Sequence, residues 1–212
     1  MKGFLLAIFL TCCLGSGSPD PSFAIETIND TLYDRILKGG SFVENPYIQR
    51  NDLRHLRLLH YDGNGKICVG NLICHKSIAQ DLKEIFEELY RQKYPIQRIQ
   101  LIDDFGADDE QSMRANNTYC FCFRTIAGSK KLSKHAQGLA IDINPLYNPC
   151  VKTPKNGQRI VQPSTARKYV DRSKTFPYKI TKSDLCYRLF IQHGFRWGGN
   201  WKSLKDYQHF EK

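Results

Sequence analysis

Residues 133–145 read SKHAQGLAIDINP, and the interpretation of the whole chain starts from this stretch. The run LAIDIN has the alternation typical of a β-strand, with Ile141 and Ile143 on one face. Asp142 is then expected on the opposite face, which we predict to be polar and open. His135 precedes it, on the other side of Gly138. Because a buried strand is usually apolar, these two polar residues are either hydrogen-bonded core residues or two parts of one site.

The segment before this stretch predicts a hairpin followed by a helix. Residues 60–76 have apolar runs on both sides of a turn sequence, Asp-Gly-Asn-Gly, which is typical of a β-hairpin. Ser77 and Gln80 match a capping box at the start of a helix, which we expect to end before Pro95. The helix has an apolar stripe, which we interpret as core: Ile78, Leu82, Ile85, Phe86 and Leu89.

Other segments complete an α+β pattern. Residues 96–103 and 118–125 are predicted strands, residues 106–117 a short helix or loop, and residues 183–193 a second helix that ends at Gly194. Helices and strands do not alternate in the rhythm of a parallel βαβ fold. The sequence therefore predicts an α+β fold, with a small antiparallel sheet flanked by helices.

The N-terminus has the pattern of a secretory signal peptide. A basic residue, Lys2, precedes a short apolar run and a small-x-small cleavage pattern that ends at Ala24. We predict that residues 1–24 are removed, and that the mature protein is secreted or periplasmic and has no integral membrane segment. Lipid attachment at Cys12 or Cys13 is a weaker alternative. Residues 25–58 are predicted to form an N-terminal extension, and residues 59–212 a single, monomeric domain.

Cysteines have a particular meaning in an exported chain. Because an oxidising compartment favours disulfides, we expect the cysteines after residue 24 to be paired. Cys120 and Cys122 would share one face of a strand and would each pair with another partner. The sequence leaves the connectivity open among Cys68, Cys74, Cys120, Cys122, Cys150 and Cys186.

The overall charge indicates the kind of partner. The hydrophobic content of 41% and the charged content of 25% are ordinary for a globular protein. The net charge of +10 is compatible with an anionic partner surface, or with solubility alone.

A second polar motif lies near the C-terminus, in WGGNWKSLKDYQHFEK, residues 197–212. Asp206 and His209 have the spacing D-x-x-H, beside Trp201, which we expect to form part of a substrate-binding wall. Catalytic zinc sites use three protein ligands and leave one position open, and a nearby carboxylate handles the proton of the attacking water. His209 is therefore a candidate third ligand, and Asp206 a candidate general base.

The two motifs together resemble the S-x-H-x-x-G-x-A-x-D and [DE]-x-x-H signatures of the D-alanyl-D-alanine carboxypeptidase family of zinc peptidases, over roughly residues 59–211. The family also includes L-alanyl-D-glutamate endopeptidases. The resemblance implies that zinc is bound by His135, Asp142 and His209, and that Asp206 is the general base. It also implies that Arg124 stabilises the oxyanion or holds a substrate carboxylate, and that Ser133 contacts substrate or fixes the loop of His135.

The resemblance implies hydrolysis of D-amino-acid-containing peptide bonds in peptidoglycan stem peptides. Carboxypeptidase action on D-Ala-D-Ala is the first expectation, and endopeptidase action on L-Ala-D-Glu or on cross-links is the alternative. A non-catalytic, zinc-containing wall-binding or signalling module is a further alternative, because the animal Hedgehog signalling domain resembles this fold. No phosphate-binding loop or aromatic–basic stripe is present, so a nucleic-acid partner is not expected.

Overall fold

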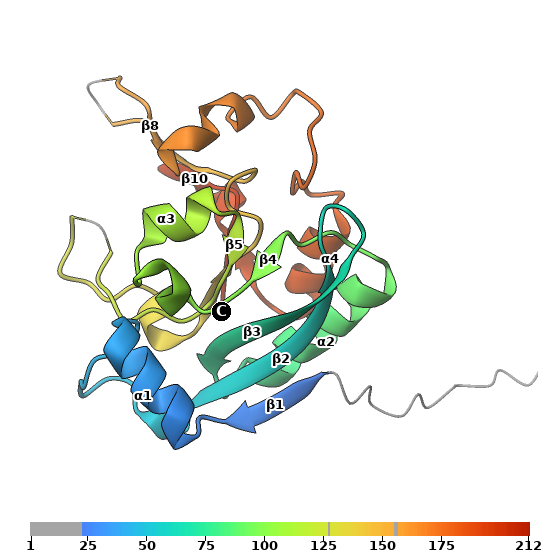
Figure 1. Ribbon diagram of the computed structural model, residues 1–212. Coiled ribbons are helices and arrows are strands. Elements are labelled where there is room, and N and C mark those ends of the chain that lie inside the picture. Colours follow the sequence, from blue (N-terminus) through green and yellow to red (C-terminus); the bar gives the residue numbers. More distant parts are fainter. Residues whose placement is uncertain (1–22, 127, 155–156) are drawn as a thin grey trace, which may run out of the picture.

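The computed structural model describes residues 23–126, 128–154 and 157–212 (Figure 1). The predicted α+β class is confirmed, because helices and small antiparallel sheets are interspersed along the chain. The predicted signal peptide lies outside the described residues except for its last two. Of these, Phe23 is buried against Tyr90, and Ala24 is the first residue of a strand.

The first sheet is built around a long hairpin. Strand β2 (Leu53–Tyr61) pairs with β3 (Ile67–His75), and β1 (Ala24–Thr27) pairs with the other side of β2, all antiparallel. The predicted turn is present, because the Asp62 carboxylate accepts hydrogen bonds from the backbone N–H groups of Asn64 and Lys66. The boundary predicted between residues 58 and 59 falls inside β2.

Helix α2 (Ala79–Arg91) covers this sheet with its predicted apolar stripe. All five stripe residues are buried, and each such side chain contributes about 1.5–3 kcal/mol to stability. The predicted capping box is wrong. The Ser77 hydroxyl bonds to His75 Nδ1, and the Gln80 amide donates to Glu84, so neither side chain caps the helix.

Residues 25–58 are integrated into the fold through β1, β2 and helix α1 (Asp30–Gly39). The Asn29 side chain caps the start of α1 by accepting from the Leu32 N–H, and Gly40 ends it with a φ of 91°. Ile36 of this helix belongs to a second buried cluster that also includes Leu53 and Phe121.

The middle of the chain contains shorter elements than predicted. These elements are β4 (Arg98–Ile99), α3 (Asp109–Arg114) and β5 (Asn117–Thr118), with the 3₁₀ helix η2 (Ile102–Phe105). Another 3₁₀ helix, η1 (Arg50–Asp52), directly precedes β2. The strand predicted over residues 118–125 is wrong beyond Thr118. Only isolated bridges remain, at Tyr119 and Thr125. Between them, the N–H of Cys122 donates to the His135 carbonyl in η3 and that of Phe123 to the Ser41 carbonyl, so no continuous strand forms.

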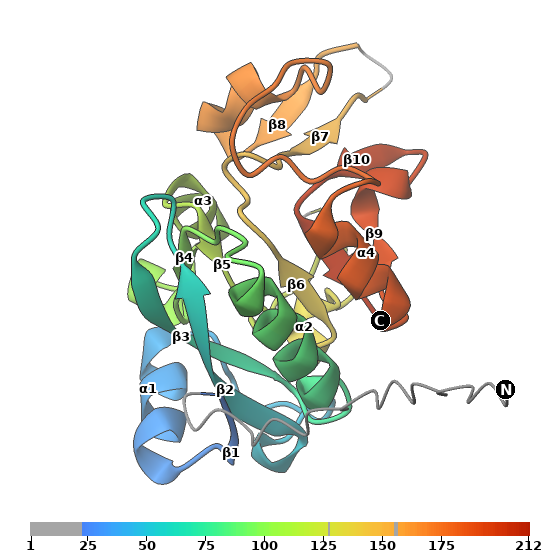
Figure 2. The ribbon, with the colours of Figure 1, turned by 90° about the vertical axis from the view of Figure 1, so that its right-hand side faces the viewer.

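The C-terminal half contains two further antiparallel sheets, in the orders β6-β11-β9 and β10-β7-β8. Figure 2 shows β7 and β8 at one end of the molecule and α1 at the other. The predicted second helix is confirmed as α4, which Asp184 caps and which ends before Gly194. The bounds of these elements are β6 (Ala140–Asp142), β7 (Cys150–Lys152), β8 (Ile160–Gln162), β9 (Arg196–Trp197), β10 (Leu204–Asp206), β11 (His209–Glu211), α4 (Leu185–Gln192), η3 (His135–Gln137), η4 (Ser164–Tyr169) and η5 (Gly198–Asn200).

Strand β6 is enclosed, contrary to the open polar face predicted for Asp142. Ala140, Ile141 and Asp142 are all buried. The reason is that β11 lies along one edge of β6, and Tyr119 forms an antiparallel bridge with Asp142 at the other. A charged side chain at this depth needs partners of opposite charge.

The six cysteines of the described chain are free thiols, contrary to the predicted disulfides. Cys74, Cys120 and Cys186 pack in the main core as small apolar side chains, and burial raises the pKa of each thiol. None of the described helices is long and apolar enough to cross a bilayer.

Candidate metal centre

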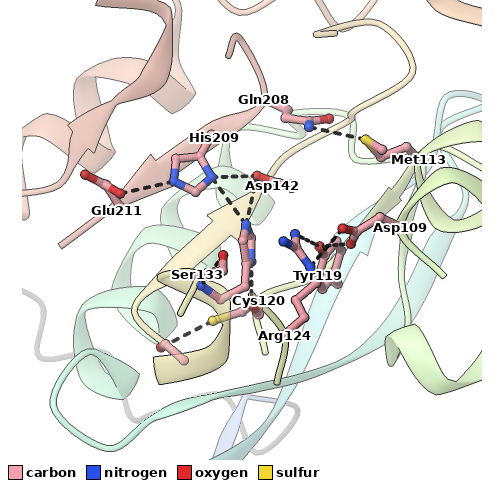
Figure 3. Close-up of polar contacts among 12 residues, drawn as sticks. Asp109, Met113, Tyr119, Cys120, Arg124, Ser133, Asp142, Gln208, His209 and Glu211 are labelled. Carbon is pink, nitrogen blue, oxygen red and sulfur yellow. Dashed lines mark hydrogen bonds and ion pairs between the residues drawn. The ribbon is translucent and has the colours of Figure 1, made fainter. Parts of the chain in front are cut away.

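Three predicted ligands meet at the junction of β6, β11 and η3. Asp142 and His209 are direct cross-strand partners, and His135 approaches them from η3. Asp142 Oδ1 lies 3.0 Å from His209 Nδ1 and 3.4 Å from His135 Nε2, and the two imidazole nitrogens are 3.3 Å apart. Figure 3 shows the contact between His209 and Asp142. The three side chains are buried, so the fold brings together groups that are distant in sequence.

The spacing of the three atoms fits a zinc ion. A tetrahedral site with bonds of about 2.0–2.1 Å has ligand atoms roughly 3.3 Å apart, close to the three distances measured here. Two imidazoles and one carboxylate are also a usual donor set for zinc, and a fourth position would remain for water or substrate.

The conformation of the chain around His135 depends on Gly138 and Ser133. Gly138 has a φ of +66°, and a Cβ at this position would lie 2.6 Å from the backbone nitrogen of His75. Only glycine allows this approach without strain. The Ser133 hydroxyl accepts a hydrogen bond from the His135 N–H at 3.2 Å. Ser133 is buried in the structure, in the position of a residue that fixes the loop.

Each imidazole has a hydrogen-bond partner on the nitrogen that faces away from the cluster. His135 Nδ1 lies 2.6 Å from the Cys120 carbonyl oxygen, so Nδ1–H donates and Nε2 is left as the ligand atom. His209 Nε2 lies 3.4 Å from Glu211 Oε2 (Figure 3). Such partners orient metal-binding histidines.

Glu211 was not predicted as a site residue. It lies two positions after His209 on the same strand, so its side chain is on the same face, and this alternation could have identified it. The guanidinium of Arg196, on the neighbouring strand β9, holds the Glu211 carboxylate at 2.8 Å.

The electrostatics of the cluster favour a cation. Burial alone would raise the pKa of Asp142, but the charges and hydrogen bonds of His135 and His209 outweigh it and hold the pKa well below its usual value. Burial lowers the pKa of His209, but Asp142 and Glu211 more than reverse this and raise it to about 10. Positive charge in the cluster, from protons or from a metal, is therefore stabilised by these carboxylates.

Asp206 lies on β10, close to the cluster. Burial, with a further contribution from the charge of Asp142, raises the pKa of Asp206 to about 7, against the opposing effect of His209. Its Oδ1 atom is enclosed and has no hydrogen-bond partner among the described residues. A Cβ on Gly198 would lie 2.6 Å from the Asp206 carbonyl oxygen and 3.3 Å from His209 Cβ, so this glycine lets the two residues pack closely.

Arg124 lies near the cluster, in an ion pair that the sequence did not predict. Its Nε is 2.8 Å from Asp109 Oδ2, and its Nη2 donates to the Tyr119 hydroxyl at 3.1 Å (Figure 3). Tyr119 also donates to Asp109, and its ring stacks on His135 with the centroids 5.0 Å apart. Burial would lower the pKa of Arg124, but Tyr119 and Asp109 outweigh it, so the guanidinium remains charged beside the candidate metal site.

Trp201, the predicted substrate-binding residue, lies against the third ligand. Its ring centroid is 5.2 Å from that of His209, and the side chain is partly exposed. The structure thus places all the predicted site residues around one cluster. Arg124 and Ser133 precede the ligands in the chain, and Trp201 and Asp206 precede His209.

An α+β fold with a buried His–Asp–His cluster and a neighbouring carboxylate of raised pKa has the groups that a mononuclear metallohydrolase needs. Residues 127–212 match the family model for D-alanyl-D-alanine carboxypeptidase, which confirms the resemblance predicted from the two motifs and supports a peptidase of this family. The match includes the three candidate ligands and Asp206, whereas Arg124 lies just before it. No curated protein and no solved structure matches the chain.

Proposed function

We propose that this protein is a secreted zinc peptidase that hydrolyses D-amino-acid-containing bonds in peptidoglycan stem peptides, with D-Ala-D-Ala carboxypeptidase action as the first candidate. The main support is the arrangement of His135, Asp142 and His209 at 3.0–3.4 Å from one another, beside the raised pKa of Asp206. The match of residues 127–212 to the carboxypeptidase family supplies the substrate class.

Each side chain has a role that follows from its position. His135, Asp142 and His209 would hold the zinc ion, which supplies Lewis-acid chemistry by polarising the peptide carbonyl and making water more acidic. Asp206 accepts a proton from the attacking water and returns it to the leaving amine, since its pKa of about 7 suits both transfers near neutral pH.

Arg124 would stabilise negative charge on the substrate. Its guanidinium is already oriented by Asp109 and Tyr119, so little side-chain entropy is lost when it meets an oxyanion or a terminal carboxylate. Trp201 provides an aromatic surface beside His209 on which the substrate can pack.

The proposal also includes the place of action. The predicted signal peptide supports export of a monomeric protein to the periplasm or the outside of the cell, where peptidoglycan lies. The net charge of +10 is complementary to an anionic wall polymer. Fractionation of cells that express the full chain, followed by N-terminal sequencing, would test this: a cytoplasmic protein with an intact N-terminus would contradict it.

The activity is tested on a defined muropeptide with a pentapeptide stem. The zinc-loaded protein is incubated with it, and mass spectrometry follows the products. Loss of one terminal alanine indicates carboxypeptidase action, and cleavage after L-alanine indicates endopeptidase action instead. Asp206→Asn is the control, since it keeps the size of the side chain but cannot accept the proton. Full zinc occupancy with no cleavage of any stem peptide would favour a binding module and contradict the proposal.

A further inference from the structure

A cleft with positively charged walls lies on the sheet that carries the proposed general base. Its volume is about 320 Å³, and its walls come from β7, β10 and the segments next to them. This sheet, in the order β10-β7-β8, is at one end of the molecule (Figure 2). Three of the lining side chains are cations: Arg159, Lys202 and Lys205.

The cleft is separate from the candidate metal centre. Val151 and Lys205 are direct partners in the register of β7 and β10, and both line the cleft. Asp206 follows Lys205 on the same strand, so its side chain is on the opposite face of the sheet. A ligand in the cleft would therefore lie across the sheet from the general base.

The charges in the cleft are not balanced by carboxylates. None of the described residues that line it is acidic, and none of its three cations forms an ion pair with a described carboxylate. Lys205 donates instead to the Gly199 carbonyl at 3.3 Å. Asp171, next to the lining residue Val170, lies 3.8 Å from Lys174. Because like charges around one cavity repel one another, a bound anion would be stabilised there.

A partly buried guanidinium adds positive charge beside the cleft. The Arg172 guanidinium carbon is 4.4 Å from the centroid of the Tyr207 ring, and Tyr207 lines the cleft. The hydrogen bonds of Arg172 go to neutral acceptors, namely the carbonyls of Tyr147 and Ile180 and the amide oxygen of Asn148. Its charge therefore adds to that of the lining cations.

The lining chemistry favours an oxyanion. Arginine and lysine form strong, charge-assisted hydrogen bonds with carboxylate and phosphate oxygens. The hydroxyls of Thr153 and Ser203 also line the cleft and supply further donors. Pockets for small ligands have volumes of roughly 300–1,000 Å³. A cleft of about 320 Å³ thus has room for one charged group with part of its carrier, and not for a folded partner.

We propose that this cleft binds a carboxylate or phosphate group of the peptidoglycan polymer, and that it holds the protein on the wall at a second position besides the stem that is cut. This inference rests on the proposed function, which supplies the polymer. It assigns a binding site to residues that belong to neither of the two motifs.

Retention on insoluble peptidoglycan tests the cleft without measuring catalysis. The cleft variant, Arg159→Gln/Lys202→Gln/Lys205→Gln, removes three charges from side chains that are exposed or partly exposed. Its affinity in a sedimentation assay should be about tenfold lower than that of the wild type, since each exposed ion pair contributes little. The difference should shrink as salt is added.

A second triple variant, Lys38→Gln/Lys66→Gln/Arg98→Gln, is the matched control. It removes the same charge and the same residue types from exposed positions on other elements. Its affinity for the wall should stay close to that of the wild type. Equal losses in the two variants would show that only the net charge matters, and would overturn the inference.

The charged group is identified by repeating the assay on peptidoglycan treated with hydrofluoric acid, which removes phosphate-linked polymers. A difference between the two variants that persists after treatment indicates a stem-peptide carboxylate. A difference that disappears indicates a phosphate group.

A titration of the wild-type protein locates the site even if the cleft variant does not fold. Inorganic phosphate and acetate are added in turn, and NMR follows the backbone amides. Shifts should be concentrated at Val151, Thr153, Ser203 and Lys205. Shifts confined to other parts of the chain would overturn the inference.

The inference and the proposed function fail in different ways. A protein that cuts stem peptides but is retained equally by both triple variants contradicts the inference alone. A protein that cuts no stem peptide, yet loses retention only in the cleft variant, contradicts the peptidase function and keeps the cleft as a wall-binding site.

Discussion

Asp142 and His209 are direct partners in the register of β6 and β11, and their ligand atoms are 3.0 Å apart. One strand pair thus positions two of the three candidate ligands. Because a shift of one residue would turn His209 to the opposite face, the register of this pair is as important for the site as the residues themselves.

Metal affinity should increase with pH. The pKa of His209 is raised to about 10, so in the metal-free protein this imidazole is protonated at neutral pH and must release its proton when it binds zinc. For one proton released, the apparent affinity should rise about tenfold per pH unit between roughly pH 6 and 8. Competition with a chromogenic chelator measures it, and an affinity independent of pH would contradict the assignment of His209.

Glu211→Gln should weaken zinc binding. The carboxylate accepts from His209 Nε2 and is held by Arg196, and loss of such a partner typically costs 10–100-fold (about 1.4–2.7 kcal/mol) in metal affinity. Glu87→Gln is the control, since Glu87 belongs to a helix-surface ion pair with Lys83. Equal zinc affinity in both variants would show that Glu211 does not orient His209.

Asp206→Asn should stabilise the metal-free protein while it removes activity. The folded pKa of about 7 is above the ordinary 3.8, so the folded state favours the protonated acid. In the wild type, the stability that the Asp206 side chain contributes is fully present below about pH 4, where the carboxyl is protonated in both states. This contribution is lost as the pH rises to 7, because the unfolded state ionises first. The variant should therefore melt a few degrees higher than wild type at pH 8 and at the same temperature near pH 3.5.

The activity of the same variant should fall by about 10²–10⁴, the usual contribution of a general base. Calorimetry and the muropeptide assay measure the two effects separately. A lower melting temperature at pH 8 would mean that the ionised carboxylate has a stabilising partner in the folded state.

Gly198→Ala should disturb both Asp206 and His209. The new methyl group would lie 2.6 Å from the Asp206 carbonyl oxygen. Because this oxygen belongs to the backbone, the clash is relieved only if the backbone of β10 or of residue 198 moves. We expect a loss of about 1–3 kcal/mol in the free energy of unfolding, together with lower zinc occupancy. Gly65→Ala, where a Cβ meets open space, strains only the local turn and should keep its zinc. Full zinc occupancy in Gly198→Ala would contradict the close packing described here.

The sequence was sufficient to predict the elements whose patterns are local. The stripe of α2 and the hairpin of β2 and β3 follow from side-chain periodicity and turn chemistry. The ligands were predictable because their spacing, together with the D-x-x-H motif, matches a zinc donor set and resembles a known family.

Other features depend on contacts that are remote in sequence. Residues 120–124 have strand-like alternation, but their backbone bonds reach Ser41 and His135, which the local pattern does not indicate. The buried face of Asp142 has the same cause, since Tyr119 and β11 enclose β6. The capping box failed because the Ser77 hydroxyl bonds to the His75 imidazole and not to the helix backbone, and the capping motif alone does not include this neighbour.

The ligand cluster also joins regions of the chain that are far apart in the sequence, since His209 follows Asp142 by 67 positions. A bound ion would act as a cross-link that closes this long loop, and it would oppose the separation of β11 from β6. Zinc should therefore slow the opening of β11. Hydrogen exchange at the Ile143 amide, which donates to the Gln208 carbonyl just before β11, would report that opening directly.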